Sequence, residues 1–311
     1  MNRRFWLFYE FNRSNYSYDI MGWIYASLKG YFGGGYSTGY SNEIDGIQFS
    51  DESAINPDAE LSVARLGLAG VNSTTRGYFG GGWTGSVSKE IDGIRFSNES
   101  AINPDAELSV ARYILAGVNS TTRGYFGGGT TGSVSKEIDG IQFSNESAIN
   151  PDAELSVARS MLAGVNSDTR GYFGGGSSTG ISNEIDGIQF SDETAINPLA
   201  TLSVARYILA GVNSTTRGYF GGGSTGSVSK EIDGIQFSDE SAINPSATLS
   251  VARSKLAGVN SSTRGYFGGG DTGSKSSEID GIQFSNESAI NPSATLSVAR
   301  SDLASVQSGS L

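Results

Sequence analysis

The sequence contains neither cysteine nor histidine. Without cysteine there can be no disulfide framework and no thiolate metal site. Without histidine, the chain lacks the commonest general base, the usual zinc ligand and the side chain that titrates near neutral pH. These absences argue against an enzyme, and we expect the protein to use neither a cofactor nor a metal.

Long apolar runs and positive charge are also scarce. No segment approaches the roughly 20 apolar residues of a membrane-spanning helix, so we expect no transmembrane segment. Lys and Arg number 21 against 32 Asp and Glu, which gives a net charge of −11. Because nucleic-acid binding depends on basic side chains that neutralise phosphates, this balance predicts no nucleic-acid partner.

Glycine, by contrast, is abundant, at 44 of 311 residues, and it is periodic. The stretch Gly-Tyr-Phe-Gly-Gly-Gly begins at Gly30 and returns every 47 residues, at Gly77, Gly124, Gly171, Gly218 and Gly265. No Gly-Lys-Ser or Gly-Lys-Thr follows the glycines, so they are not phosphate-binding loops. They predict close approach of backbones instead, and the repeat predicts a six-unit array.

Each unit contains four short β-type runs separated by turn residues, without a helical period. In the second unit we expect strands at residues 68–71, 77–82, 91–96 and 101–103. Small Ala69 and Gly70 suit an innermost strand, whereas Pro104 places the fourth strand at the edge. The sequence therefore predicts an all-β fold, a six-bladed β-propeller of 47-residue, four-stranded repeats.

The ends of the chain predict how the ring closes. The first unit begins at Lys29 with its glycine strand and lacks an inner strand, whereas residues 303–306 stand in register with residues 68–71. A C-terminal strand in the first blade would remove the exposed sheet edges of an open array. Met21 and Ile24 fall in the same register and are the alternative.

We divide the chain into an N-terminal extension, residues 1–28, and the propeller, residues 29–311. The extension is rich in aromatic residues. It is interpreted either as a segment that packs on the array or a neighbouring chain, or as an arm that docks the protein to a larger assembly. The candidate docking residues are Phe5, Trp6, Phe8, Tyr9 and Phe11.

Acidic pairs such as Glu90 with Asp92 recur in the units, as do Arg65 and Arg76. Their spacing does not match a calcium-binding EF-hand loop, so we expect structural ion pairs between blades or within turns. A ring of weak cation sites is the alternative. The repeated tyrosine, Tyr78 in the second unit, is expected in the core.

The positions that vary between units follow the glycine triplet and the arginine of the Leu-Ser-Val-Ala-Arg segment. In an antiparallel four-stranded blade, both connections emerge on the same face. Exposed apolar residues on a rigid scaffold predict a recognition surface, although relaxed drift in loops would give the same pattern. The candidate binding residues are Tyr36, Tyr40, Leu66, Trp83, Tyr113, Ile114, Met161, Ile181, Tyr207, Ile208, Lys255, Asp271 and Lys275.

The order of these motifs resembles the kelch repeat over residues 29–308. Kelch units carry a tryptophan after the third strand, where this chain has Ile55, Ile102, Ile149, Ile196, Ile243 and Ile290. The wording Gly-Tyr-Phe-Gly-Gly-Gly, followed by an Ile-Asp strand and Leu-Ser-Val-Ala-Arg, is also similar to repeats in virion and tail-fibre proteins of marine and cyanobacterial tailed phages. That resemblance implies a structural or host-contacting role in a particle.

We therefore expect a non-enzymatic attachment or receptor-binding module of the tail-fibre or adhesin type, located on a virion or an extracellular surface. Its expected partners are other subunits of the virion or surface assembly and a glycan or protein of the host surface. The alternative is a decoration or connector protein of a particle, docked through the N-terminal extension.

Overall fold

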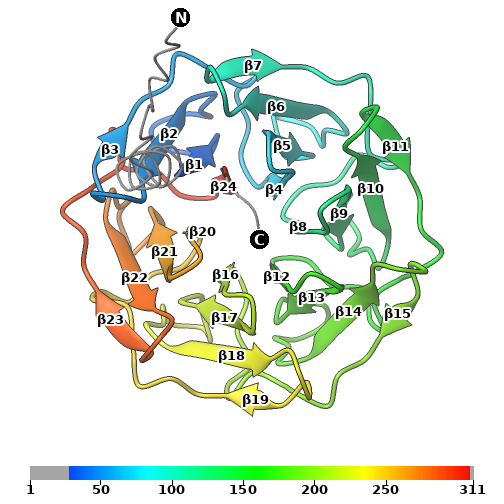
Figure 1. The fold of residues 1–311 in the computed structure, drawn as a ribbon. Helices are drawn as coiled ribbons and strands as arrows, with labels where there is room; N and C mark the ends of the chain where they lie inside the picture. The colour runs from blue at the N-terminus through cyan, green and yellow to red at the C-terminus, as the bar shows by residue number, and fades with distance from the viewer. Residues whose placement is uncertain (1–27, 309–311) are drawn as a thin grey trace, which may run out of the picture.

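The computed structural model describes residues 28–308, which form six four-stranded antiparallel sheets arranged in a ring (Figure 1). The sheets repeat about every 47 residues, and their strands run in chain order from the axis outward in five of the six. The predicted six-bladed β-propeller is therefore confirmed.

The strands occupy the same four positions in every blade. The innermost strands are β24 (Ala304–Gln307), β4 (Ala69–Asn72), β8 (Ala116–Asn119), β12 (Ala163–Asn166), β16 (Ala210–Asn213) and β20 (Ala257–Asn260). The second strands are β1 (Lys29–Gly33), β5 (Arg76–Gly80), β9 (Arg123–Gly127), β13 (Arg170–Gly174), β17 (Arg217–Gly221) and β21 (Arg264–Gly268). The third strands are β2 (Ile44–Gln48), β6 (Ile91–Arg95), β10 (Ile138–Gln142), β14 (Ile185–Gln189), β18 (Ile232–Gln236) and β22 (Ile279–Gln283). The outermost strands are β3 (Ala54–Ile55), β7 (Ser100–Ile102), β11 (Ser147–Ile149), β15 (Ala195–Ile196), β19 (Ala242–Ile243) and β23 (Ser288–Ile290).

Blade 1 consists of β24 and β1–β3, and blades 2 to 6 follow along the chain from β4–β7 to β20–β23. The C-terminal strand β24 pairs with β1 in the register Gly30↔Gln307 and Tyr31↔Val306. The ring is thus closed by the C-terminal strand, as predicted. Met21 and Ile24, the alternative, lie outside the described residues.

The hydrophobic core lies between the blades. The cluster between blades 1 and 2 contains Tyr31, Phe79, Ile94 and Val306, whereas Ile91 belongs to the next cluster, between blades 2 and 3. The third strand of blade 2 therefore buries apolar side chains on both faces, which is expected where a sheet is packed between two others. Six such clusters, one per interface, hold the ring together.

Glycine is required where neighbouring blades approach most closely. A Cβ at Gly117 of β8 would lie 2.1 Å from the carbonyl oxygen of Gly70 in β4, a distance that no side chain tolerates. In the triplet, Gly81 has a φ of +69°, and a Cβ there would lie 2.5 Å from the carbonyl oxygen of Arg112. Gly82 donates its N–H to that same carbonyl at 2.9 Å. The triplets therefore join adjacent blades, as predicted.

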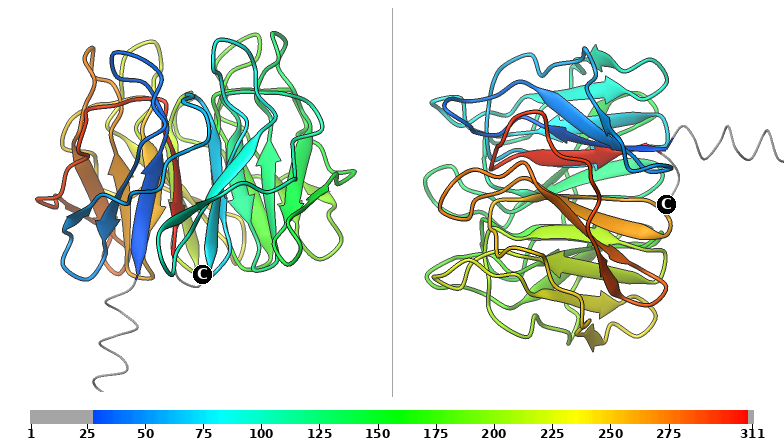
Figure 2. Two further views of the ribbon diagram at one scale, coloured as in Figure 1. Left: turned by 90° about the horizontal axis from the view of Figure 1, so that it is seen from above. Right: turned by 90° about the vertical axis from the view of Figure 1, so that its left-hand side faces the viewer.

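The two faces of the disc differ (Figure 2). We call the face that carries the loops between second and third strands, and the links between blades, the loop face. The turn face carries the short turns before the second and fourth strands. The described chain begins and ends on the turn face, where Lys29 N donates to Ser308 Oγ at 2.7 Å. Residues 28–308 include no helix long and apolar enough to cross a membrane.

Candidate functional site

The variable positions are paired across the loop face. In blade 2, Trp83, which follows the glycine triplet, exchanges two backbone hydrogen bonds with Leu66, which follows the arginine, at N···O distances of 2.8 and 3.1 Å. The same bridge recurs in every blade, joining Tyr36 to Ser301, Tyr113 to Thr130, Ser160 to Ser177, Tyr207 to Ser224 and Ser254 to Asp271. The variable residues therefore share one face, and their role in binding stays a prediction.

Four of the predicted binding residues form a continuous aromatic row across blades 1 to 3. The rings of Tyr36 and Tyr40 are 6.0 Å apart, centroid to centroid, in an edge-to-face arrangement. Trp83 Nε1 donates to the hydroxyl of Tyr40 at 3.1 Å, and the ring of Trp83 lies 5.2 Å from that of Tyr113. These contacts hold the four side chains, the aromatic row, in fixed relative positions on partly exposed surface.

A charged pair from blade 6 extends this row at Tyr36. Lys275 Nζ lies 5.6 Å from the centre of the Tyr36 ring and 2.6 Å from Asp271 Oδ2. The hydrogen bond from Lys275 lowers the pKa of Asp271, so the carboxylate stays ionised at neutral pH. Because the pair is partly exposed, it orients the ammonium group over the ring more than it stabilises the fold.

The aromatic row does not continue around the rest of the loop face. Thr130, Ser177 and Ser224 occupy the position of Trp83 in blades 3, 4 and 5. Ile181 is exposed in blade 4, and Tyr207 lies in blade 5, two blades from Tyr113. The structure therefore does not bring Tyr207 or Ile181 into the aromatic row, and it makes the loop face asymmetric despite the repeat.

At the axis, the loop face ends in a ring of six residues with left-handed backbones: Gly67, Ile114, Met161, Ile208, Lys255 and Asp302. Each N–H donates to the carbonyl oxygen of its neighbour in the preceding blade, at 2.5–2.9 Å. A φ of 51° at Ile114 and 53° at Ile208 is strained for a β-branched residue. Together with the leucines beneath it, the ring lines a cavity of about 70 Å³.

The axial cavity has two chemically different sides. Ile114, Met161 and Ile208 are apolar, whereas Lys255 Nζ lies 3.3 Å from Asp302 Oδ2 on the other side. Asp302 is absent from the predicted binding residues. It stands at the same repeat position as Lys255, and that alignment is the signal that could have identified it.

The charged residues of the turn face and interior are structural, as predicted. On the turn face, Glu146 Oε1 of blade 3 accepts hydrogen bonds from Arg76 Nη1 at 3.0 Å and from the hydroxyl of Tyr78 at 2.9 Å, both in blade 2. Burial, together with Glu146, raises the pKa of Tyr78 to about 12. Arg65, in the link between blades 1 and 2, pairs with Asp92 of β6 at 2.8 Å. Tyr78 is fully buried and stacks on Phe143, which confirms its place in the core.

Sequence reasoning missed a second axial feature, the asparagine that ends the inner strand in five of the six blades. The predicted inner strand, residues 68–71, stops one residue before it. The side chains instead cross to the preceding blade: Oδ1 of Asn119 in blade 3 accepts a hydrogen bond from the backbone N–H of Asn72 in blade 2 at 3.3 Å. The signal was available, because an asparagine recurs there every 47 residues, with Gln307 in its place in the last unit.

The predicted docking residues Phe5, Trp6, Phe8, Tyr9 and Phe11 lie outside the described residues. Among residues 28–308, no group of three His, Cys, Asp or Glu side chains is placed to hold a metal ion.

Comparison of the sequence with known protein families found no match, and no curated protein matched with significant similarity. The fold itself defines the class of the protein: a six-bladed β-propeller with internal four-stranded repeats.

Proposed function

We propose that the protein is a non-enzymatic attachment module of a virion, and that its loop face binds a host-surface glycan. The observation that carries the proposal is the aromatic row of Tyr36, Tyr40, Trp83 and Tyr113. Aromatic side chains combine a large apolar surface with polar tips, and here neighbouring contacts restrict their movement. One face of a pyranose ring is lined by C–H groups that pack well on such surfaces, while hydroxyls reach the polar tips.

The proposed location on a virion rests on the sequence of the repeat and on the geometry of the two faces. The Gly-Tyr-Phe-Gly-Gly-Gly repeats resemble those of phage virion and tail-fibre proteins, and the motif order resembles the kelch repeat. The chain enters the propeller at Leu28, on the turn face. An N-terminal arm attached there would dock to a particle while leaving the loop face free.

A second candidate function, a connector or decoration subunit of a particle, is favoured by a different observation. The Leu-Ser-Val-Ala-Arg links expose one valine in every blade to nearly the same extent, 46–49%. These are Val63, Val110, Val157, Val204, Val251 and Val298. A symmetric partner would contact six equal apolar groups, whereas a glycan would contact the asymmetric aromatic row.

Tyr113 and Tyr207 provide a matched test of the glycan proposal. Both begin the same sequence, Tyr-Ile-Leu-Ala-Gly, but only Tyr113 joins the aromatic row. We expect Trp83→Ser with Tyr113→Ser to weaken binding to a glycan array, or adsorption to host cells, by at least about tenfold, since each lost aromatic anchor removes 1–2 kcal/mol or more. Tyr207→Ser should bind as the wild type does.

Equal binding by wild type and the double variant, at unchanged thermal stability, would refute the glycan proposal. The connector function is tested separately on assembled particles. If six valines hold a subunit, Val110→Asp with Val204→Asp should release the protein from particles while glycan binding by the purified protein persists. Retention of that variant on particles would contradict a connector role for the valines.

A further inference from the structure

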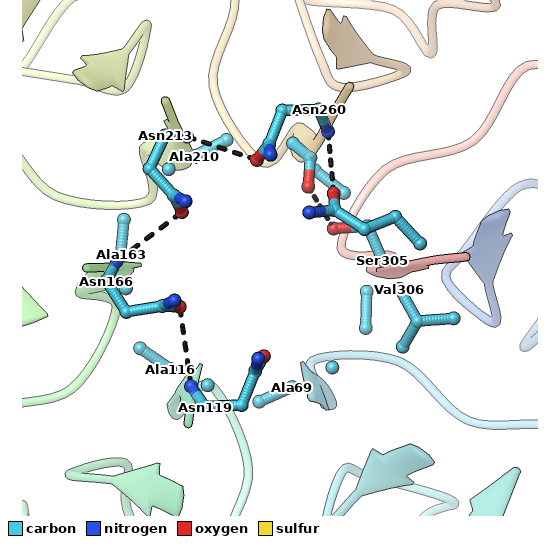
Figure 3. Close-up of a pocket in the computed structure, with 18 of the residues that line it drawn as sticks. Ala69, Ala116, Asn119, Ala163, Asn166, Ala210, Asn213, Asn260, Ser305 and Val306 are labelled. Carbon is cyan, nitrogen blue, oxygen red and sulfur yellow. Dashed lines mark hydrogen bonds between the residues drawn. The ribbon is translucent and has the colours of Figure 1, made fainter. Parts of the chain in front are cut away.

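The inner strands end at the turn face in a closed ring of carboxamides around the axis, part of which Figure 3 shows. Asn119 N donates to Asn166 Oδ1 at 3.3 Å, and Asn166 N donates to Asn213 Oδ1 at 3.4 Å. Equivalent bonds of 2.6–3.3 Å complete the circle, so that each blade contributes one member. We call Asn72, Asn119, Asn166, Asn213, Asn260 and Gln307 the amide ring.

The hydrogen bonds fix which way each amide points. A backbone N–H can only donate, so the side-chain oxygen must face it, and the NH₂ group is turned away from that bond. In Figure 3 the carboxamides of Asn119, Asn166 and Asn213 reach toward the open centre of the ring. Asn166 is only 6% exposed, and its Nδ2 is buried with no hydrogen-bond partner among the described residues.

The space that the amide ring surrounds is a cavity of about 120 Å³. Apart from the ring, the described residues that line it are Ala, Gly, Leu, Val and Ser, without a charged side chain. At about 30 Å³ per liquid water, the cavity holds a small ion with two or three waters. The amide ring thus places side-chain N–H donors around a cavity whose other side chains carry no charge.

We propose that the amide ring binds a small monovalent anion, such as chloride, on the propeller axis. The amino protons carry positive partial charge, so they repel a cation. A water molecule accepts only two hydrogen bonds and must also place its own protons, whereas a halide accepts from several donors at once. Concave arrangements of N–H groups are common anion sites in proteins. An anion held in this way would connect the inner strands of all six blades.

Bromide replaces chloride and scatters anomalously, which makes the first test direct. In crystals grown with sodium bromide, we expect an anomalous peak on the axis, within hydrogen-bond distance of the amide nitrogens. In solution, we expect Tm to rise with chloride at constant ionic strength, with gluconate as the balancing anion, by about 5 °C at a concentration a hundred times the Kd.

Asn166→Asp tests the amide ring itself. The aspartate keeps an oxygen for the N–H of Asn119, but it replaces a donor with a negative charge, so the bromide peak and the chloride dependence of Tm should both disappear. Asn145→Asp is the matched control. It adds the same charge to an exposed turn where other units already carry Asp51, Asp192 and Asp239, and chloride should stabilise this variant as it does the wild type.

A wild-type crystal without bromide on the axis would overturn the proposal, even if Asn166→Asp fails to fold. A bromide peak without any chloride dependence of Tm would show an adventitious ion only, and would overturn it equally.

Discussion

The buried ion pair of Arg65 and Asp92 gives the sharpest prediction about stability. Their side chains are 0% and 4% exposed, and Arg65 Nη2 lies 2.8 Å from Asp92 Oδ2. Burial lowers the pKa of Arg65, which Asp92 partly offsets, yet an arginine still remains charged. Arg65 Nε and Nη1 have no hydrogen-bond partner among the described residues. The carboxylate is therefore the principal compensation for this buried charge.

We expect Asp92→Asn to lower the free energy of unfolding by about 3–5 kcal/mol, because the change keeps the shape but leaves a buried cation without its counter-charge. Replacing both partners, Arg65→Met with Asp92→Leu, should restore most of that loss, since an apolar pair needs no compensation. Asp192→Asn is the control. Asp192 is exposed, and asparagine occupies its repeat position in other units, so the change should cost under about 0.5 kcal/mol.

Urea unfolding followed by both circular dichroism and fluorescence measures these differences, and coincident transitions would justify a two-state analysis. If Asp92→Asn cost no more than Asp192→Asn, the pair would not compensate the buried arginine, and the reasoning would fail. If the double variant were as unstable as Asp92→Asn, packing rather than charge would explain the loss.

Three other predictions concern closure, packing and pH. Ending the chain after Ser301 removes β24 and exposes the edge of β1, so the protein should aggregate; a monomer of unchanged Tm would contradict closure. Gly117→Ala should cost more than about 3 kcal/mol in urea unfolding, because its Cβ would lie 2.1 Å from a carbonyl oxygen, whereas Gly85→Ala, which meets nothing within 4 Å, should cost no more than its left-handed φ of +109° requires. Burial raises the pKa of Tyr78 to about 12 from about 10, so the contribution of Tyr78 to the free energy of unfolding is complete below pH 10 and falls by about 1.4 kcal/mol per pH unit as the pH rises toward 12. Between pH 10 and 11.5, the free energy of unfolding of Tyr78→Phe should therefore fall less steeply than that of the wild type. Equal slopes for the two proteins would refute the assignment.

The fold was predictable because the 47-residue period constrains the strands, their order in each blade and the closure of the ring. Strand order, the outer position of the run before Pro104 and the closing role of residues 303–306 all follow from the register of the 47-residue repeat. Each position meets the same neighbours six times, so a wrong assignment would have failed in six places. Contacts between blades were not predictable in the same way. Asn72 and Asn119 are 47 residues apart, and only the curvature of the ring brings the side chain of one to the backbone of the other.

The loop face shows most clearly what could not be predicted from the sequence. The sequence gives Tyr113 and Tyr207 identical surroundings, and it predicts the same role for both. In the structure, the partner of Tyr113 is Trp83 of blade 2, which in turn contacts Tyr40 of blade 1. In the blades beside Tyr207, Ser177 and Ser224 occupy the position of Trp83. A residue's surroundings on this face therefore depend on what the adjacent unit carries.

The ring of left-handed residues at the axis carries a cost in stability. Gly67 adopts its φ of +65° without steric cost, whereas a left-handed backbone costs about 1–2 kcal/mol for a residue with a side chain. Ile114 and Ile208 adopt it nonetheless, at a position where the chain itself shows that glycine fits. We infer that Ile114 and Ile208 contribute to recognition at the mouth of the axis rather than to stability. The comparison to make is Ile114→Gly, which should raise Tm while weakening any ligand held at the mouth; a variant that gained stability and lost no binding would leave the isoleucine without a role in recognition.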